Sequence, residues 1–223
     1  YFSELDQGAG FLEHLDAEDR DALAAIATRL PLSRGETLFM QGERHVGVWI
    51  IETGRVRTFY VGESGREMTL AYWTPGHFVG GPEVFGGGRH IWSADAAEDS
   101  VLRHVAGDGL KALCARRPRV ALALIDGLVA KGKCYSTLVQ MLGTRSIGER
   151  LRMLLRAMAD RCGCETADGV AIDRTVTQEQ LAMMVGSTRQ WVAVNLQRMR
   201  QSGLIELRRD RIVLRSGFWT DTA

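Results

Sequence analysis

The chain has 223 residues and a formal net charge of +1, with 45% hydrophobic and 25% charged residues, which is an ordinary composition for a globular protein. No apolar run is long enough to span a bilayer, no basic-then-apolar signal segment opens the sequence, and the 4 cysteines are scattered. Composition therefore argues against a membrane or disulfide-rich secreted protein and favours a reducing, cytoplasmic setting with no membrane partner.

Residues 11–30 have the spacing of an amphipathic helix. From Arg34 to about Val105, short strands alternate with glycine-containing turns, as in ETLFM, GVWIIETG and EMTLAYWTPG. Strands at this spacing are typical of an antiparallel barrel or jelly roll. We therefore expect residues 1–117 to form a β-roll.

A long helix is predicted from Pro118 to about Gly143. Along it runs a heptad-like stripe whose second half is rich in small residues: Leu122, Ile125, Val129, Gly132, Ser136, Val139 and Gly143. A neighbouring apolar stripe contains Leu124, Leu128, Tyr135, Leu138 and Leu142. Because two stripes let one helix pack on its own domain and on a second copy, residues 118–145 are interpreted as a dimerisation helix and hinge. Packing wholly within one subunit is the alternative.

Residues 146–217 carry the most informative pattern. A helix is expected over Ile147–Arg161, then a polar loop over Gly163–Asp173, and then two short amphipathic helices joined by a Gly-Ser-Thr turn. Leu204–Leu207 and Ile212–Arg215 read as two strands around an arginine-rich turn. This order is typical of a winged helix-turn-helix, which places a helix N-terminus in the DNA major groove.

The ends of the two short helices have recognisable capping residues. Thr177 and Gln180 match a capping box, and Gly186 suits a helix C-terminus. Ser187 or Thr188 is expected to cap the second helix, and Ser187 with Gln190 would form a second capping box. Val192, Leu196 and Met199 recur at helical spacing and should face the core.

Charge is distributed unevenly along the chain. Residues 145–215 hold 13 arginines against 8 acidic residues, whereas residues 1–144 hold 15 basic residues against 18 acidic ones. An electropositive C-terminal third is the footprint of a DNA-binding module, so double-stranded DNA is the expected partner.

With these features in this order, the chain resembles the Crp/Fnr superfamily of bacterial transcription regulators over nearly its whole length. The resemblance rests on the long helix, the winged helix, the segment Thr74–Gly80 and the glycines of the roll, namely Gly35, Gly42, Gly54, Gly65, Gly76 and Gly80. It implies an α+β fold class: an N-terminal double-stranded β-helix (jelly-roll) sensor domain, a long dimerisation helix and a C-terminal winged helix-turn-helix.

The family also implies a function. A homodimer would bind a pseudo-palindromic operator under the control of a small effector sensed by the β-roll, and RNA polymerase would be a partner of an activator. The alternative is a β-roll small-molecule-binding protein or cupin-like enzyme with an incidental helical tail. The chain lacks the closely spaced His/His/Glu set of cupins, and it has neither a Ser/His/Asp nor a nucleophilic Cys arrangement. No catalytic residue is expected.

The resemblance assigns residues to DNA recognition. In the best-known branch, the recognition helix begins Ser-Arg-Glu, with an arginine four residues after the glutamate, and the matching residues here are Thr188, Arg189, Gln190 and Val194. Arginine suits guanine and glutamine suits adenine, whereas valine offers only an apolar contact, so the half-site should deviate from TGTGA. Candidate phosphate contacts are Thr177, Ser187, Thr188 and, in the wing, Arg208, Arg209 and Arg211.

The cyclic-nucleotide branch offers a template for the sensor: a Phe-Gly-Glu segment, a short helix and an Arg-Ser pair. Gly81 stands at the glutamate position and His90 replaces the serine, whereas Arg89 is retained. A cyclic nucleotide stays among the candidate effectors, but the motif that would hold it is degenerate. The candidate effector-binding residues are Gly80, Gly81, Glu83, Arg89, His90, Tyr135 and Ser136.

Other cofactors are disfavoured by their ligand requirements. No iron–sulfur cluster is expected, because the first cysteine is Cys114 and no N-terminal cluster exists. Haem would need His77, His90 or His104 as axial ligand, and a lone histidine in a β-roll is more often structural. Cys162 and Cys164 lack the spacing and partner ligands of a zinc site, so no metal is expected. The cofactor is left unknown.

Overall fold

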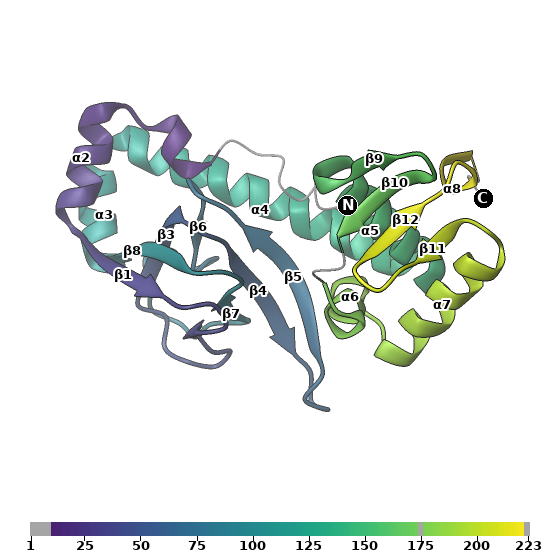
Figure 1. The fold of residues 1–223 in the computed structure, drawn as a ribbon. Helices are drawn as coiled ribbons and strands as arrows, with labels where there is room; N and C mark the ends of the chain where they lie inside the picture. Colours follow the sequence, from purple (N-terminus) through teal and green to yellow (C-terminus); the bar gives the residue numbers. More distant parts are fainter. Residues whose placement is uncertain (1–9, 174–175, 221–223) are drawn as a thin grey trace. The chain divides into compact units, whose positions relative to one another are not determined.

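The computed structural model describes residues 10–173 and 176–220, so the first nine residues of the expected β-roll domain lie outside the described residues. The chain divides into two compact units, whose described parts are residues 10–138 and 139–220 (Figure 1). None of the described helices is long and apolar enough to cross a membrane.

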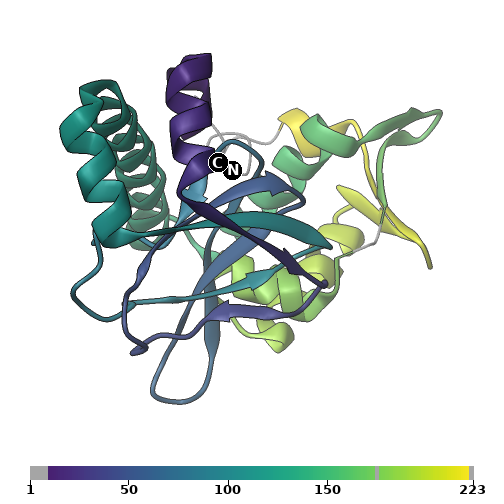
Figure 2. The same cartoon turned by 90° about the vertical axis from the view of Figure 1, so that its left-hand side faces the viewer.

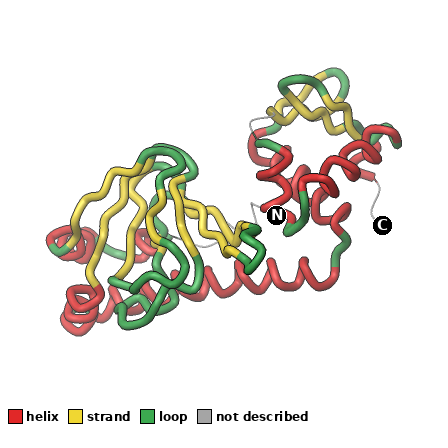
Figure 3. The backbone as a smooth tube through the Cα atoms, turned by 90° about the horizontal axis from the view of Figure 1, so that it is seen from below, coloured by secondary structure: helices red, strands yellow, loops and turns green. Residues whose placement is uncertain are grey.

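The first unit is built on an antiparallel β-roll, as predicted. One sheet has the strand order β1-β8-β3-β6 and the other has the order β2-β7-β4-β5. The strands are β1 (Ala27–Leu32), β2 (Thr37–Phe39), β3 (Gly47–Thr53), β4 (Val56–Val61), β5 (Glu67–Trp73), β6 (Phe78–Val79), β7 (Ser93–Ala96) and β8 (Ser100–Ala106). The curved strands of the roll are the larger group of yellow segments in Figure 3.

The helices of this unit correct the sequence interpretation at two places. Residues 11–30 do not form one helix but a 3-10 turn η1 (Phe11–His14), helix α2 (Ala17–Ala25) and the start of β1. Pro31 lacks an amide hydrogen, which disfavours a helix, and β1 instead pairs with β8 along its whole length. Helix α3 (Gly107–Arg116), which was not predicted, lies beside α2 at one end of the roll (Figure 2).

Side chains of β3 alternate between two apolar environments, because successive residues of a strand point to opposite faces. Val48 and Ile50 belong to the main core of the unit, with Phe78 and residues of α2, α3 and α4 (Pro118–Thr144). Trp49 packs instead on Phe39, with ring centroids 5.0 Å apart. The second environment is therefore separate from the core on which the helices pack.

The second unit has the elements of a winged helix-turn-helix. Its elements are α5 (Ile147–Cys162), β9 (Cys164–Thr166), β10 (Gly169–Asp173), α6 (Gln178–Val185), α7 (Arg189–Gln201), β11 (Ile205–Leu207), β12 (Arg211–Leu214) and α8 (Gly217–Thr220). The four strands form one sheet in the order β11-β12-β10-β9, which lies to one side of the helices in Figure 3.

The prediction of a polar loop over Gly163–Asp173 is wrong. This segment forms β9 and β10, and β10 pairs with β12 from Val170 to Asp173. Ala171 and Ile172 are buried, so the segment contributes to the apolar interior of the sheet. Its pairing partner lies about 40 residues later in the chain, which is why local polarity alone suggested a loop.

Candidate DNA-binding surface and effector region

The turn between α6 and α7 is held by side-chain and glycine caps. Thr177 Oγ1 accepts a hydrogen bond from the Gln180 amide at 3.2 Å, and Gln180 Oε1 accepts one from the Thr177 amide at 2.8 Å, which confirms the predicted capping box. Gly186 ends α6 with φ of +62°, a left-handed conformation that favours glycine. These caps set the direction in which α7 leaves the turn.

At the start of α7, Thr188 is the cap. Its Oγ1 accepts a hydrogen bond from the Trp191 amide at 3.3 Å. Ser187 is buried, and its hydroxyl has no hydrogen-bond partner among the residues that the structure describes. The expected capping box of Ser187 with Gln190 is therefore wrong, because the helix begins one residue later. Ser187 also lacks the exposed hydroxyl that a phosphate contact would need.

Helix α7 has one buried face and one open face. Val192, Leu196 and Met199 are buried, as their spacing predicted. Arg189 and Gln190 are exposed at the first turn, and Val194 is exposed one turn further on. The N-terminal end of α7 therefore presents a guanidinium, an amide and an apolar side chain to solvent, which is the donor and acceptor inventory that major-groove readout requires.

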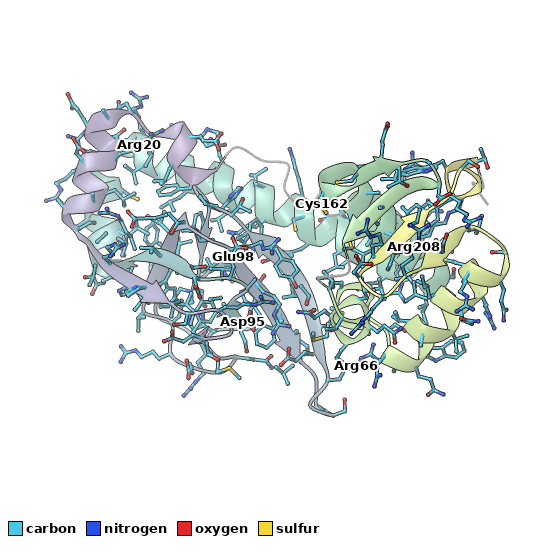
Figure 4. All side chains as sticks on the ribbon, viewed as in Figure 1. Arg20, Arg66, Asp95, Glu98, Cys162 and Arg208 are labelled. Atoms are coloured by element: carbon cyan, nitrogen blue, oxygen red, sulfur yellow. The ribbon has the colours of Figure 1, made fainter. Side chains whose placement is uncertain are left out.

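The wing arginines differ in the ion pairs that they form. Arg208, labelled in Figure 4, pairs with Asp168 at 2.7 Å and with Glu206 at 2.8 Å. Hydrogen bonds from Arg208 and Arg215 lower the pKa of Glu206 to about 2, so this carboxylate is ionised at neutral pH. Arg211 pairs with the neighbouring Asp210 at 2.8 Å. Arg209, in contrast, is exposed and forms no ion pair within the described part of the chain.

The loop that aligns with a cyclic-nucleotide pocket is packed closely around its glycines. Gly80 has φ of +95°, and a Cβ there would lie 2.9 Å from the Trp49 ring. A Cβ on Gly81 would lie 3.6 Å from Leu128 Cδ2 of α4, so a longer side chain at position 81 would run toward that helix. Position 81, where the template has its glutamate, therefore holds no polar side chain.

Three further candidates from the loop lie in contrasting surroundings. Arg89 is exposed, and its Nη1 donates a hydrogen bond to the Gly42 carbonyl at 2.6 Å. His90 is buried and stacks on Phe39, with ring centroids 3.8 Å apart. Glu83 is exposed, beside Gly88. Arg89 and His90 thus do not reproduce the Arg-Ser pair of the template, because one donates to a backbone carbonyl and the other is buried on Phe39.

On α4, the two neighbouring candidates separate. The Tyr135 ring packs against Trp92 at 5.3 Å and edge-on to Trp73 at 6.3 Å between centroids, and burial raises the pKa of its hydroxyl. Ser136 is exposed. Only Tyr135 faces the roll, so the residues present do not fit a cyclic nucleotide held in the usual manner.

Comparison with known proteins gives the family. The cyclic nucleotide-binding domain family matches residues 29–117, and the Crp-like helix-turn-helix domain family matches residues 149–216. The global nitrogen regulator of Synechococcus elongatus is 28% identical over 193 residues, which is 83% of this chain and 87% of that protein. A CRP-like cAMP-activated global transcriptional regulator of Mycobacterium tuberculosis is 27% identical over 190 residues, covering 83% of this chain and 84% of that protein.

The fold agrees with these relatives. The solved structure of the c-di-GMP responsive global regulator CLP of Xanthomonas campestris has a TM-score of 0.81, at 19% identity, covering 90% of this chain and 100% of that one. The chain belongs to the Crp/Fnr family of transcriptional regulators. The predicted family, fold class and DNA-binding regulatory function are confirmed over the cupin-like alternative. Crp-like helix-turn-helix regulators bind DNA and usually act as dimers.

In this Crp/Fnr regulator, the predicted heptad-like stripe lies on an exposed face of α4. The exposed fractions are 60% for Leu122, 54% for Ile125, 49% for Val129 and 69% for Val139. Gly132, Ser136 and Gly143 of the same stripe are also exposed. We call these seven residues the outer strip. Large apolar side chains gathered along one helix face mark an interaction surface.

Sequence reasoning missed the buried cation of this regulator. Lys131 is 6% exposed, and its ammonium lies 3.3 Å from the centroid of the Trp73 ring and 4.8 Å from that of Phe78. No carboxylate pairs with it in residues 10–173 and 176–220, and burial lowers its pKa to about 7. The sequence does show that Lys131 interrupts the second apolar stripe of α4, between Leu128 and Tyr135. We call that stripe, which runs through Leu124, Leu128, Tyr135, Leu138 and Leu142, the inner stripe.

Two histidines, His90 and His104, pack against Trp49 inside the roll of the regulator, and a third, His45, packs against His90. The His45 and His90 rings are 4.3 Å apart, and the His104 ring lies 5.0 Å from Trp49. Neither ring nitrogen of His90 has a hydrogen-bond partner among the described residues. Burial and the neighbouring His45 lower the pKa of His90 to about 4. The described residues also include no group of three metal-ligating side chains suited to an ion.

Acid should destabilise the roll through His90. Because the folded-state pKa is lowered to about 4 from the ordinary histidine value of 6.5, stability present above pH 6.5 is lost as the pH falls toward 4. His90→Phe keeps a ring against Phe39 and is expected to remove on the order of 2 kcal/mol of this loss. Urea unfolding at pH 7 and pH 4.5 measures it. An unchanged loss of stability in His90→Phe would show that His90 is not its source.

Proposed function

We propose that this regulator acts as a homodimer on a pseudo-palindromic operator and that a small effector bound by the β-roll controls it. The first turn of α7 supports sequence-specific DNA binding most directly. Arg189 and Gln190 are exposed there, whereas the opposite face of the same helix is buried. In this arrangement the helix N-terminus enters the major groove and the two half-sites lie about one helical turn of DNA apart.

Each exposed side chain of that turn has a distinct chemical task in the proposal. Arg189 donates two hydrogen bonds, to guanine O6 and N7. Gln190 forms two hydrogen bonds with adenine, or its amide NH₂ donates and its amide oxygen accepts at another base edge. Val194 contacts a thymine methyl. An operator with a guanine but without the full TGTGA pattern is the expected result.

Phosphate contacts position the helix without reading sequence. Thr177 and Thr188 are exposed at the two caps, and Arg209 is exposed in the wing, so these three are the first candidates. Arg208 and Arg211 would contact phosphate while sharing or exchanging their carboxylate partners. Ser187 is omitted because it is buried.

The proposed dimer interface is the outer strip of α4. A parallel pair of such helices buries the four large apolar side chains, and the small residues Gly132, Ser136 and Gly143 permit close approach of the backbones. A two-fold axis along the strip makes the same surface self-complementary. The dimer then presents two copies of α7 to one operator, and RNA polymerase would be its partner if it activates transcription.

For the effector, we propose a small molecule other than a cyclic nucleotide bound in the usual manner. The supporting observations are the glycine at position 81, the buried His90, and the cluster of Lys131, Trp73 and Tyr135 between α4 and the roll. An effector shifts the population only if it binds the DNA-competent state better, and coupling of about 1–3 kcal/mol is typical. Protein purified from its native host would reveal such a molecule by mass spectrometry.

Arg189→Ala is expected to lose discrimination for one guanine in each half-site, at a cost of about 1–3 kcal/mol per contact, because the bidentate pair is removed. Gel shifts with an operator selected from a randomised palindromic library, and with the same operator carrying adenine at that guanine, measure the effect. Arg200→Ala, an exposed arginine in the last turn of α7, should keep the discrimination. Equal discrimination by Arg189→Ala and wild type would remove Arg189 from base reading.

A further inference from the structure

An exposed tryptophan lies at the front of α7. Trp191 is 51% exposed and Val194, three residues later, is 37% exposed. Across the described residues, the Trp191 side chain has no ring contact and its indole N–H donates to no acceptor. Tryptophan is usually well buried, and its N–H usually finds a partner where the ring packs. The ring therefore has no evident role in packing its own unit.

The position of this ring is nevertheless fixed by the backbone that carries it. The Trp191 amide donates to Thr188 Oγ1 at 3.3 Å, and Asn195 Nδ2 donates to the Trp191 carbonyl at 2.8 Å. Val192, the next residue, is fully buried. The first turn of α7 is thus anchored on both sides of Trp191, so the ring is presented to solvent from a rigid element.

The surroundings of the ring match nucleic acid. Steps of three and four residues place Trp191, Val194 and Arg198 on one outward face of the helix. Segment Arg189–Gln201 contains no acidic residue, and its arginines at positions 189, 198 and 200 are all exposed. An apolar patch within a cationic, acid-free helix is complementary to a polyanion that also carries apolar groups.

We propose that Trp191 and Val194 form an apolar strip that reads thymine methyl groups in the major groove. The inference rests on the proposed function, because it requires α7 to enter that groove. The thymine C5-methyl is the apolar group among the base edges there, and apolar side chains recognise it by contact. Arg189 and Gln190 then read hydrogen-bonding edges, while the strip selects thymine at a neighbouring position, and the indole N–H is free to donate to a phosphate oxygen.

Removing single methyl groups from DNA tests this directly. The full-length protein first selects an operator from a randomised palindromic library, and each thymine of that operator is then replaced by uracil, which lacks only the C5-methyl. At one thymine per half-site, wild-type affinity should fall about fourfold for one methyl and about 15-fold when both half-sites are changed. Trp191→Ala should lose most of this methyl dependence, and Trp191→Ala/Val194→Ala, which removes the whole strip, should bind the thymine and uracil operators equally.

Two controls separate the outcomes. Gln201→Ala, exposed in the last turn of the same helix, should keep the methyl dependence, and thermal unfolding of Trp191→Ala should match wild type because the residue is exposed. Wild-type indifference to every uracil, or full methyl dependence in Trp191→Ala, overturns the inference. So does a Trp191→Ala protein that binds DNA normally but no longer binds RNA polymerase, since the strip would then contact protein.

Failure of the proposed function gives a different result. If the wild-type protein selects no operator at all, DNA reading by α7 is overturned and the inference falls with it. If an operator is selected and Arg189→Ala loses its guanine preference, the proposed function stands, and the uracil series alone decides the role of Trp191.

Discussion

Replacing Lys131 with methionine is expected to stabilise the first unit by about 4 kcal/mol at pH 7 and below, because burial lowers the pKa of this ammonium from 10.5 to about 7. The aromatic rings of Trp73 and Phe78 offset part of the desolvation cost, but no carboxylate accompanies the charge in the part of the chain that the structure describes. Methionine has a similar length and no charge, so it should fill the same volume.

The pH dependence identifies the cause. Between pH 7 and 10.5 the unfolded chain holds a proton on Lys131 that the folded chain lacks, so wild-type stability should rise with pH across this window. Lys131→Met should lack that rise and should raise the unfolding midpoint by about 10 °C at neutral pH. Thermal unfolding of both proteins from pH 6 to pH 9.5 measures the difference.

Lys133→Met provides the matched control, because Lys133 is exposed on the same helix and its replacement should change stability by about 0.5 kcal/mol at most. A Lys131→Met protein that is less stable than wild type at every pH would show that the ammonium makes a favourable contact in the fold. If Lys131→Met is more stable as expected, then Lys131 lowers the free energy of unfolding of the wild-type protein. Such residues are usually retained for function, which supports its place in the proposed effector region.

Lys131 also illustrates what local patterns cannot show. Its position in the inner stripe of α4 is visible in the sequence, but its neighbours Trp73 and Phe78 come from β5 and the start of β6. Their approach depends on how the roll packs on α4. The environment of a buried charge is thus a non-local property, even when its element is predicted correctly.

Short-range interactions, in contrast, were predictable. The caps at Thr177 and Gly186 follow from contacts within a few residues, and the structure has them. The sequence indicates Ser187 or Thr188 as the N-terminal cap of α7. Only the fold decides between these two residues, because Ser187 is buried in its own unit. Strands β9 and β10 were missed because the pairing that stabilises them comes from β12.

Placing glutamates at Ile125 and Val129 is expected to dissociate the proposed dimer and to weaken operator binding by about 100-fold or more. Each charge would face its own copy across the two-fold axis of the outer strip, and like charges at a desolvated interface are strongly unfavourable. A monomer binds one half-site at a time and loses the effective concentration that links the two sites, which is worth about 10²–10⁴ in affinity. Light scattering after size-exclusion chromatography and gel shifts measure the two effects.

The design depends on the exposure of both positions in a single chain. Because Ile125 and Val129 are about half exposed, the double variant should keep the fold and the helical content of wild type. Lys133→Glu changes charge on the same exposed helix beside the strip, and it should remain a dimer with near-wild-type operator affinity. A dimeric Ile125→Glu/Val129→Glu protein would place the interface elsewhere. A folded monomer that still binds the full operator tightly would remove the need for a dimer in DNA reading, and α7 would then have to supply the affinity from one half-site alone.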